Sequence, residues 1–224
     1  MKWLALALLA TLAGACSNSQ PQIPQLTTQV NQVWSPSASA WEERLTVFVQ
    51  VTNGDGLEVL DRIQIVNDED RLVFTLDKSN WTKVERTGET WFGANNLRVP
   101  DGYVSSGDWR VLVSTRAGLQ VEAPFVIPPL APNTSSSARS ALQFNKPADL
   151  EKPFTFTGFP KDVLIWALGE QGEVLGQFKT ANNSFLLAQV VPFRTLQGRV
   201  KSLVLYSYDK TRGQGVEAGP FEVK

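Results

Sequence analysis

The alternation of apolar and polar residues over short runs is the feature that most narrows the folds open to this chain. Residues 45–51, LTVFVQV, place a leucine and three valines at every second position. The run ends at residues 53–56, Asn-Gly-Asp-Gly, a cluster of turn-forming residues. A period of two is typical of a β-strand with one buried face, and no long stretch shows the 3.6-residue period of a helix. The sequence therefore predicts strands.

Further short strands are predicted along the whole chain. Residues 62–66 and 71–76 are rich in β-branched and aromatic residues and flank the turn sequence of residues 67–70, so they predict a hairpin. The other predicted strands cover residues 89–92, 106–114, 120–127, 153–157, 162–168, 173–178 and 199–208. Strands this short, with turns every ~8 to 12 residues, favour an all-β sandwich.

An internal repeat indicates that the chain contains two such sandwiches. Residues 108–126 align with residues 200–223, where Val121-Glu-Ala-Pro-Phe125 matches Val216-Glu-Ala-Gly-Pro-Phe221. The phenylalanines are 96 positions apart (221 − 125), close to the ~100 residues of one immunoglobulin-type sandwich. The alternative is that two unrelated hairpins share a five-residue coincidence.

This layout resembles the immunoglobulin and fibronectin type III folds. The resemblance implies two tandem Ig/FnIII-like β-sandwiches, with Trp166 on an early central strand that often carries a core tryptophan. The disulfide of antibody domains is absent, which places the resemblance nearer the fibronectin type III end. The predicted organisation is a β-sandwich domain at residues 26–130, a Pro/Ser-rich linker at residues 131–138 and a second β-sandwich domain at residues 139–224.

The N-terminal residues 1–15, MKWLALALLATLAGA, have the layout of a secretory signal peptide. A positive residue, an apolar run and a group of small residues follow one another in that order. The apolar run is too short to span a bilayer, which takes roughly 20 residues. Cys16, the only cysteine in the sequence, follows directly. We therefore expect residues 1–15 to be removed.

Residues 13–16 resemble the lipobox of bacterial lipoproteins. The resemblance implies cleavage before Cys16 and lipidation of its sulfur and its new amino group, with residues 16–25 as a lipidated tether. Ala13 stands where the family usually has leucine. Ser17 follows the cysteine in place of the aspartate typical of retention in the inner membrane, which favours the outer membrane of the cell envelope. The alternative is an ordinary signal peptide cleaved after Ala15, with a free thiol left behind.

Composition excludes several classes of function. The sequence contains no histidine, which removes Ser-His-Asp and Cys-His catalysis and the commonest ligand of transition metals. The chain has 21 basic and 22 acidic residues, so a strongly basic surface for nucleic acid is not expected. Apolar runs beyond the signal peptide reach only six residues, at 163–168, so any membrane attachment is expected to come from lipid. No cofactor is expected.

Two groups of residues are candidate sites. Trp34, Trp41 and Trp81 stand beside polar residues and are possible binding residues, although a core position is the favoured interpretation for each. Asp55, Asp68 and Asp70 lie in acidic turns, where oxygen ligands from adjacent loops could hold Ca²⁺. The turns lack the D-x-D-x-D-G spacing of an EF-hand. Solvated turns explain the acidic residues equally well, and no metal site is predicted.

These observations favour a non-catalytic, lipid-anchored envelope protein with a binding or scaffolding role. Its expected partners are the membrane, through the lipid, and an envelope protein or glycan. One alternative is a sugar- or peptide-processing enzyme that uses an Asp/Glu pair, or an accessory sugar-binding module of such an enzyme. A second alternative is a surface adhesin.

Overall fold

The computed structural model describes residues 19–35, 39–129, 142–160, 162–210 and 214–223. The predicted signal peptide, Cys16 and the predicted linker at residues 131–138 lie outside these ranges.

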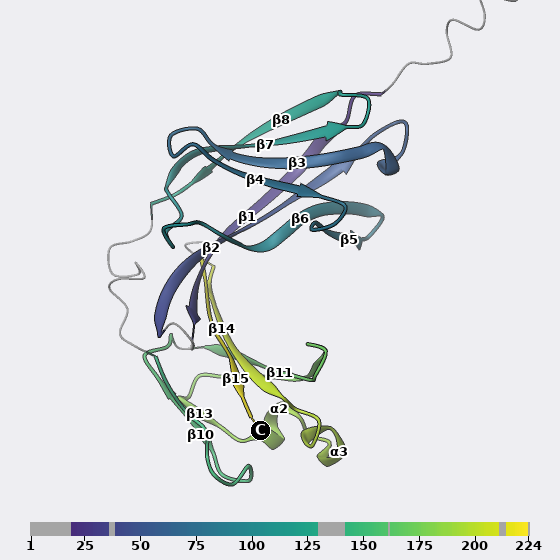
Figure 1. Cartoon of the computed structure of the whole chain (residues 1–224). Helices are drawn as coiled ribbons and strands as arrows, with labels where there is room; N and C mark the ends of the chain where they lie inside the picture. The colour runs from purple at the N-terminus through teal and green to yellow at the C-terminus, as the bar shows by residue number, and fades with distance from the viewer. Residues whose placement is uncertain (1–18, 36–38, 130–141, 161, 211–213, 224) are drawn as a thin grey trace, which may run out of the picture. The chain divides into compact units, whose positions relative to one another are not determined.

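The described residues are almost entirely β-structure, which confirms the predicted all-β fold class (Figure 1). The first strands are β1 (Gln22–Ser35), β2 (Ala40–Thr52), β3 (Leu60–Asn67), β4 (Leu72–Asp77), β5 (Thr82–Arg86), β6 (Glu89–Arg98), β7 (Gly107–Thr115) and β8 (Gln120–Ile127). The later strands are β9 (Gln143–Asn145), β10 (Phe154–Thr157), β11 (Val163–Leu168), β12 (Val174–Thr180), β13 (Ser184–Phe185), β14 (Ser202–Asp209) and β15 (Gln214–Glu222). The helical segments are one turn each: η1 (Leu57–Val59), α2 (Leu187–Val190) and α3 (Arg194–Gln197). Within the described ranges, no helix combines the length and apolarity needed to cross a bilayer.

The strands form three sheets. The largest has the order β12-β11-β14-β15-β1-β2-β6-β5, a second has the order β4-β3-β7-β8, and the third has the order β13-β10-β9. The hairpin predicted from residues 62–76 is present, since β3 and β4 pair antiparallel from Arg62↔Asp77 to Asn67↔Leu72. Both halves of the sequence repeat form pairs of neighbouring strands, β7 with β8 and β14 with β15.

Two compact units are present, and both are discontinuous in sequence. Unit 1 comprises residues 1–27, 47–94 and 107–126, and unit 2 comprises residues 28–46, 95–106 and 127–224. The division differs from the predicted one, which places all of residues 26–130 in the first domain. The difference arises because β1, β2 and β6 each contribute residues to both units.

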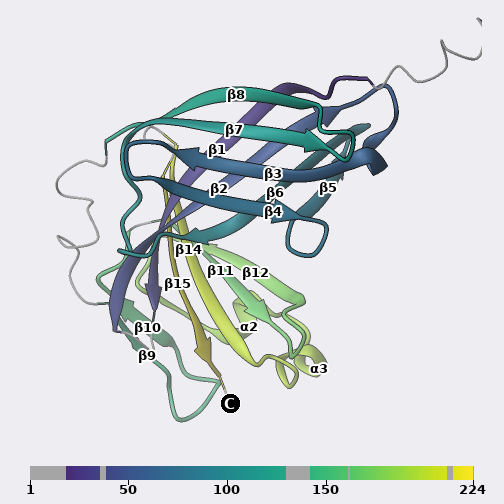
Figure 2. The same ribbon diagram turned by 45° about the horizontal axis from the view of Figure 1, so that its top comes forward.

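Unit 1 has two layers of strands, which Figure 2 shows with β4, β3, β7 and β8 over β1, β2, β6 and β5. Alternate residues of β2 are buried, as the period of two predicts: Val47, Val49 and Val51 are each at most 2% exposed. On β3 and β7, the buried pairs Ile63↔Val113 and Ile65↔Val111 lie directly opposite each other. The residues between these positions face away from the core, so β2 presents Phe48 and Gln50 on its other face.

The chain enters unit 1 earlier than predicted. Residues 22–25, which the sequence assigned to the tether, belong to β1. Ser19 and Gln20, just before the strand, also make hydrogen bonds to unit 1: the Ser19 amide donates to Asp55 Oδ2 at 2.5 Å, and Gln20 Nε2 donates to the Gln120 carbonyl at 3.1 Å. Polar residues such as Gln22 and Gln25 can belong to a strand because the ladder needs only backbone N–H and C=O groups.

Unit 2 contains a core that joins distant parts of the sequence. β1 pairs parallel to β15 from Val30↔Gln214 to Trp34↔Ala218. Trp34 thereby enters a cluster of buried residues that includes Phe154, Phe156 and Leu205. Parallel partners need a long connection between them, so this pairing leaves no local signal in the sequence.

Trp166 does not occupy the core position that the immunoglobulin resemblance implies. Its neighbours Ile165 and Ala167 are fully buried, whereas Trp166 is half-buried on the opposite face of β11. There its ring stacks on Tyr206, with ring centroids 5.3 Å apart. The prediction that Trp166 faces the core was wrong, and the adjacent residues Ile165 and Ala167 face it instead. Neighbouring residues of a strand point to opposite faces, so an error of one position exchanges the two faces.

Candidate binding groove

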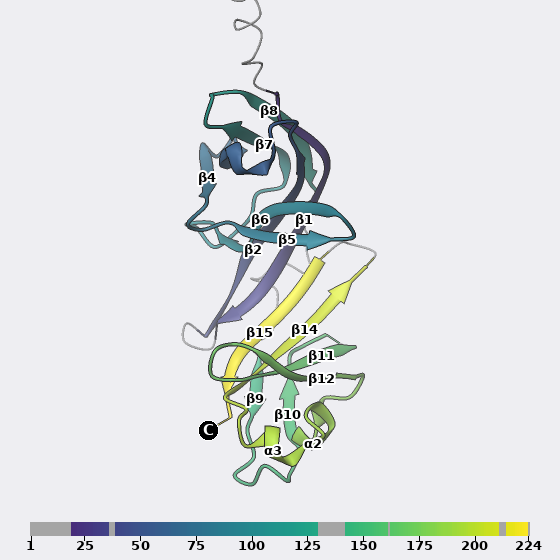
Figure 3. The ribbon, with the colours of Figure 1, turned by 90° about the vertical axis from the view of Figure 1, so that its right-hand side faces the viewer.

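An open groove of about 870 Å³ lies in unit 1 and is the candidate functional site. Its lining residues belong to four neighbouring strands in the order β1, β2, β6 and β5 and to the turn between β5 and β6. Figure 3 labels these four strands. We call the site the cross-strand groove. Its lining residues are Gln25, Leu26, Thr27, Phe48, Val84, Arg86, Thr87, Glu89 and Trp91.

The β5–β6 hairpin sets the position of five of these residues. Thr87 and Gly88 form its two-residue turn with φ angles of 53° and 81°, and two successive positive φ angles are typical of the type I′ turn that suits a twisted hairpin. The resulting register places Val84 opposite Trp91 and Arg86 opposite Glu89. Paired residues of two strands share a face, so both pairs lie on the groove side.

Gly93 makes room for the aromatic floor of the groove. A Cβ atom at this position of β6 would stand 2.0 Å from the Val47 carbonyl oxygen and 2.8 Å from Cγ of Phe48. The absence of a side chain therefore lets Phe48 lie close over β6.

The Trp91 ring is held in place by its own strand. Its Nε1 donates a hydrogen bond of 3.2 Å to Glu89 Oε2. The ring is half-buried, and its partner Val84 is 41% exposed. The groove thus combines a fixed, partly exposed aromatic floor with a polar rim, an arrangement suited to binding a ligand.

Glu89 is the one carboxylate among the lining residues in the described part of the chain. Glycoside hydrolysis with a pair of carboxylates needs a second such group on the other side of the ligand. The described lining residues of the groove do not supply this second group.

No protein-family model matches the chain, and no curated protein matches it. Among solved structures, dimeric latent PorU from Porphyromonas gingivalis is similar with a TM-score of 0.31 and 11% identity, over 90% of this chain and 20% of that one. This chain therefore spans about a fifth of the length of that structure.

Two further solved structures show a similarity of the same order. A bacterial ice-binding adhesin has a TM-score of 0.26 and 11% identity, over 89% of this chain and 63% of that one. A chimeric titin Z1Z2 tandem carrying a fibronectin GRGDS peptide has a TM-score of 0.25 and 14% identity, over 88% and 97%. At such TM-scores these similarities carry no information on function.

A second group of polar and aromatic side chains lies on unit 2. Gln29 Nε2 donates to Asn31 Oδ1 at 2.5 Å and to the Tyr206 hydroxyl at 2.9 Å. Gly215 admits these side chains, because a Cβ there would stand 2.1 Å from Asn31 Oδ1. Burial, the largest influence, raises the pKa of Tyr206. These contacts tie β1 to β14 and β15, so we assign them to the stability of unit 2.

Charged residues of β2, β6 and β15 adjoin this group. Burial alone would raise the pKa of Glu42, but hydrogen bonds from Arg98 and Arg44 outweigh it and hold that pKa below its ordinary value. For Glu217 the outcome is the opposite, because burial raises its pKa and the charge of Arg44 offsets only part of the effect.

The structure does not gather the three tryptophans singled out in the sequence into one surface. Trp34 is 7% exposed in the core of unit 2, and its ring meets that of Trp41 edge to face at 5.4 Å. Trp41 also stacks on Phe159 at 6.4 Å. Trp81 belongs to unit 1 and packs edge to face against the buried Phe92 at 5.2 Å. Each of the three therefore has an aromatic packing partner.

The carboxylates of Asp68 and Asp55 have protein partners, and Asp70 is held through its backbone amide. Asp68 accepts two hydrogen bonds from Arg110, at 2.8 and 2.9 Å, and these lower its pKa. Asp55 accepts from the Ser19 amide, and the Asp70 amide donates to Asn67 Oδ1 at 2.8 Å. Within the described residues, no three acidic, histidine or cysteine side chains are grouped as a metal site requires.

The sequence analysis missed the residues that form the groove. Phe48 stands among the polar positions of the alternating run at residues 45–51, and Trp91 alternates with the buried Phe92. A large aromatic residue on the polar face of a strand was the available signal. Cys16, the predicted lipidation site, lies outside the described residues.

Proposed function

We propose that this chain is a lipid-anchored protein of the bacterial cell envelope that binds a ligand without catalysing a reaction. The cross-strand groove carries the binding part of the proposal, because it exposes a fixed aromatic ring beside polar side chains on a sheet face. A groove of this size and composition falls in the range of ligand sites in proteins.

Two features support a non-catalytic role. Among the described lining residues, the one carboxylate is that of Glu89, and it accepts a hydrogen bond from the indole of Trp91. The sequence also contains no histidine that could activate a nucleophile. A hydrolytic activity of the purified protein that is lost in Glu89→Gln would contradict this part of the proposal.

The anchor is supported by the sequence of residues 1–16. A signal-like segment ends in small residues directly before the only cysteine, Cys16. Acylation at two or more positions holds a protein stably on a bilayer, whereas one acyl chain gives only marginal binding, with a constant of about 10⁴ M⁻¹. We place the protein on the outer membrane because Ser17, and not aspartate, follows the cysteine.

Metabolic labelling with a fatty acid tests the anchor. The wild-type protein should carry the label and fractionate with membranes, and Cys16→Ala should lose both properties. A wild-type protein without label, recovered in the soluble fraction, would refute the anchor and leave the groove unaffected.

Photo-crosslinking in intact cells tests the binding site. A photoreactive residue is placed at Val84, which lines the groove, and in a control at Val126, a 63% exposed valine of β8 outside it. A crosslinked product at position 84 and none at position 126 is expected. Equal products at both positions, or none at either, would count against the groove as the binding site.

A further inference from the structure

We propose that the cross-strand groove binds a neutral saccharide chain. The inference rests on the proposed function, since it names the ligand class of the same groove.

The floor of the groove fits the apolar faces of sugar rings. Phe48 and Trp91 present aromatic carbon on the groove side, and Val84 lies beside Trp91 on the adjacent strand. Pyranose rings expose C–H groups on their faces, which pack on aromatic rings in the way other apolar groups do. The indole is fixed by Glu89, so little conformational freedom remains to be lost on binding.

The rim fits the hydroxyl groups of a neutral sugar. Gln25, Thr27 and Thr87 supply an amide and two hydroxyls, which both donate and accept hydrogen bonds. Among the described lining residues, the charged ones are one arginine and one glutamate, Arg86 and Glu89, on opposite strands of the hairpin. Their charges cancel, so the rim does not select a charged ligand.

The direction of the groove argues against a peptide added as a further strand. Such a peptide would lie along the edge of the sheet beside β5, with backbone hydrogen bonds to it. The groove instead crosses β1, β2, β6 and β5 on their face. Edge strand β5 also carries the exposed ion pair Lys83–Glu85, with 2.7 Å between Nζ and Oε1, and charges on an edge strand discourage strand addition.

Affinity electrophoresis of the full chain, purified from membranes in detergent, tests the inference. Each native gel contains one soluble polysaccharide. Three gels contain a neutral one (a β-glucan, an α-glucan or a mannan), and a fourth contains the acidic polysaccharide alginate. At least one neutral polysaccharide should retard the protein, and Trp91→Ala should weaken the apparent affinity about tenfold or more. Gln25→Ala, a change at an exposed rim residue, should weaken it several-fold.

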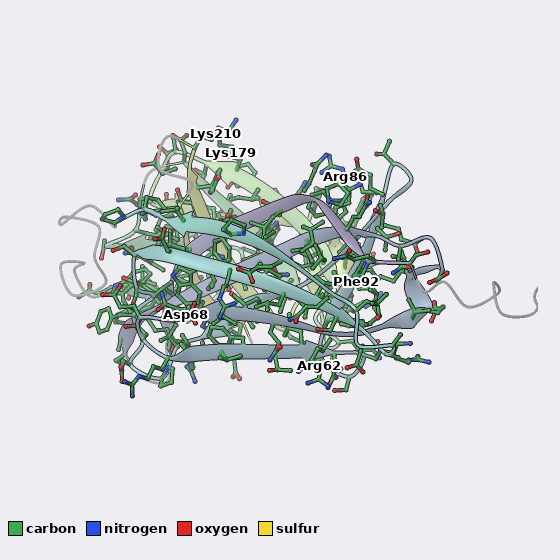
Figure 4. All side chains as sticks on the ribbon, turned by 90° about the horizontal axis from the view of Figure 1, so that it is seen from above. Arg62, Asp68, Arg86, Phe92, Lys179 and Lys210 are labelled. Atoms are coloured by element: carbon green, nitrogen blue, oxygen red, sulfur yellow. The ribbon has the colours of Figure 1, made fainter. Side chains whose placement is uncertain are left out.

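Phe193→Ala is the matched control, because Phe193 is a 69% exposed aromatic residue outside the groove. Its retardation should equal that of the wild type. Thermal unfolding of each variant shows whether it is folded, and the exposed Gln25 keeps the test valid if Trp91→Ala does not fold. Figure 4 labels two residues that are left unchanged in this series: Arg86, which lines the groove, and Phe92, which is buried.

Three results would overturn the inference: no retardation by a neutral polysaccharide, retardation by alginate alone, or retardation that persists in both Trp91→Ala and Gln25→Ala. The photo-crosslink at Val84 distinguishes a failure of the saccharide hypothesis from a failure of the proposal that the groove binds a ligand. A product at Val84 without glycan binding refutes the saccharide and retains a binding groove, whereas the absence of both refutes the two together.

Discussion

At the scale of single residues, Gly93 is a position at which the sheet leaves no room for a side chain. Gly93→Ala would place a Cβ 2.0 Å from the Val47 carbonyl oxygen and 2.7 Å from Cα of Phe48. Both are backbone atoms, so β2 and β6 must separate to accept it. We expect a loss of about 1–3 kcal/mol in the free energy of unfolding, measured by urea denaturation.

Gly198→Ala is the control for Gly93→Ala. Its nearest neighbour would lie 3.9 Å from the new Cβ, and its φ of −63° is accessible to alanine. The control should unfold close to the wild type. If Gly93→Ala were equally stable, the close approach of Phe48 to β6 would not exist in solution.

Glu217 gives a prediction for pH dependence. Burial raises the pKa of its carboxyl above the ordinary 4.5. At pH values between 4.5 and the raised pKa, the folded protein binds more protons than the unfolded chain. This group therefore lowers the free energy of unfolding as the pH rises through that interval. The loss amounts to about 1.4 kcal/mol for each unit by which the pKa is raised.

Glu217→Gln removes the titrating group. Urea unfolding between pH 4 and 8 should show the variant gaining on the wild type as the pH rises above 4.5, with the difference levelling off above the raised pKa. Glu222→Gln, at an exposed residue of the same strand, reports the general effect of removing a carboxylate from β15. A stability difference for Glu217→Gln that does not vary with pH would show that the carboxyl is not buried.

At the scale of elements, local pattern was sufficient for hairpins and insufficient elsewhere. The β3–β4 hairpin was predicted because a polar turn separates two β-rich runs. Strand β5 was missed because its sequence, TKVER, is exposed at all five positions and has no apolar alternation. Trp166 was assigned to the wrong face because every residue of its strand is apolar, so the sequence does not mark which positions face inward.

The turn between β5 and β6 is a site for stabilisation. Thr87 has a φ of 53°, which a β-branched residue adopts at a cost of about 1 kcal/mol, and asparagine tolerates this conformation better. Thr87→Asn creates the Asn-Gly pair preferred in type I′ turns. We expect a gain of about 0.5–1 kcal/mol, seen as a higher Tm in calorimetry. Thr52→Asn, at the exposed end of β2, should give no gain, and an unchanged Tm for Thr87→Asn would contradict the assigned turn.

At the scale of the whole molecule, the sequence predicted two β-structured halves but not how the chain is shared between the two units. A division near residue 130 follows naturally from the repeat and from the Pro/Ser-rich segment. Residues 28–46 nevertheless belong to unit 2, where β1 pairs with β15. Val30 and its partner Gln214 are 184 residues apart (214 − 30), and contacts between such distant segments produce no periodicity. The groove depends on the same kind of non-local order at one point, where β6 lies beside β2 and so joins the β5–β6 hairpin to β1 and β2.

Because unit 2 includes residues 28–46, we predict that residues 127–224 do not fold alone. Without residues 28–46, one edge of β15 loses its partner and the core loses Trp34, a residue 7% exposed. Removing a buried tryptophan side chain alone costs about 3–5 kcal/mol, a large part of the stability of a domain. The fragment should therefore give a poorly dispersed ¹H–¹⁵N spectrum. Synthetic peptides of residues 28–46 and 95–106, the other two segments of unit 2, should together restore dispersion. The Trp34→Ala peptide should restore it weakly or not at all, whereas a fragment that is well dispersed without any peptide would show that unit 2 is the contiguous domain that the sequence suggests.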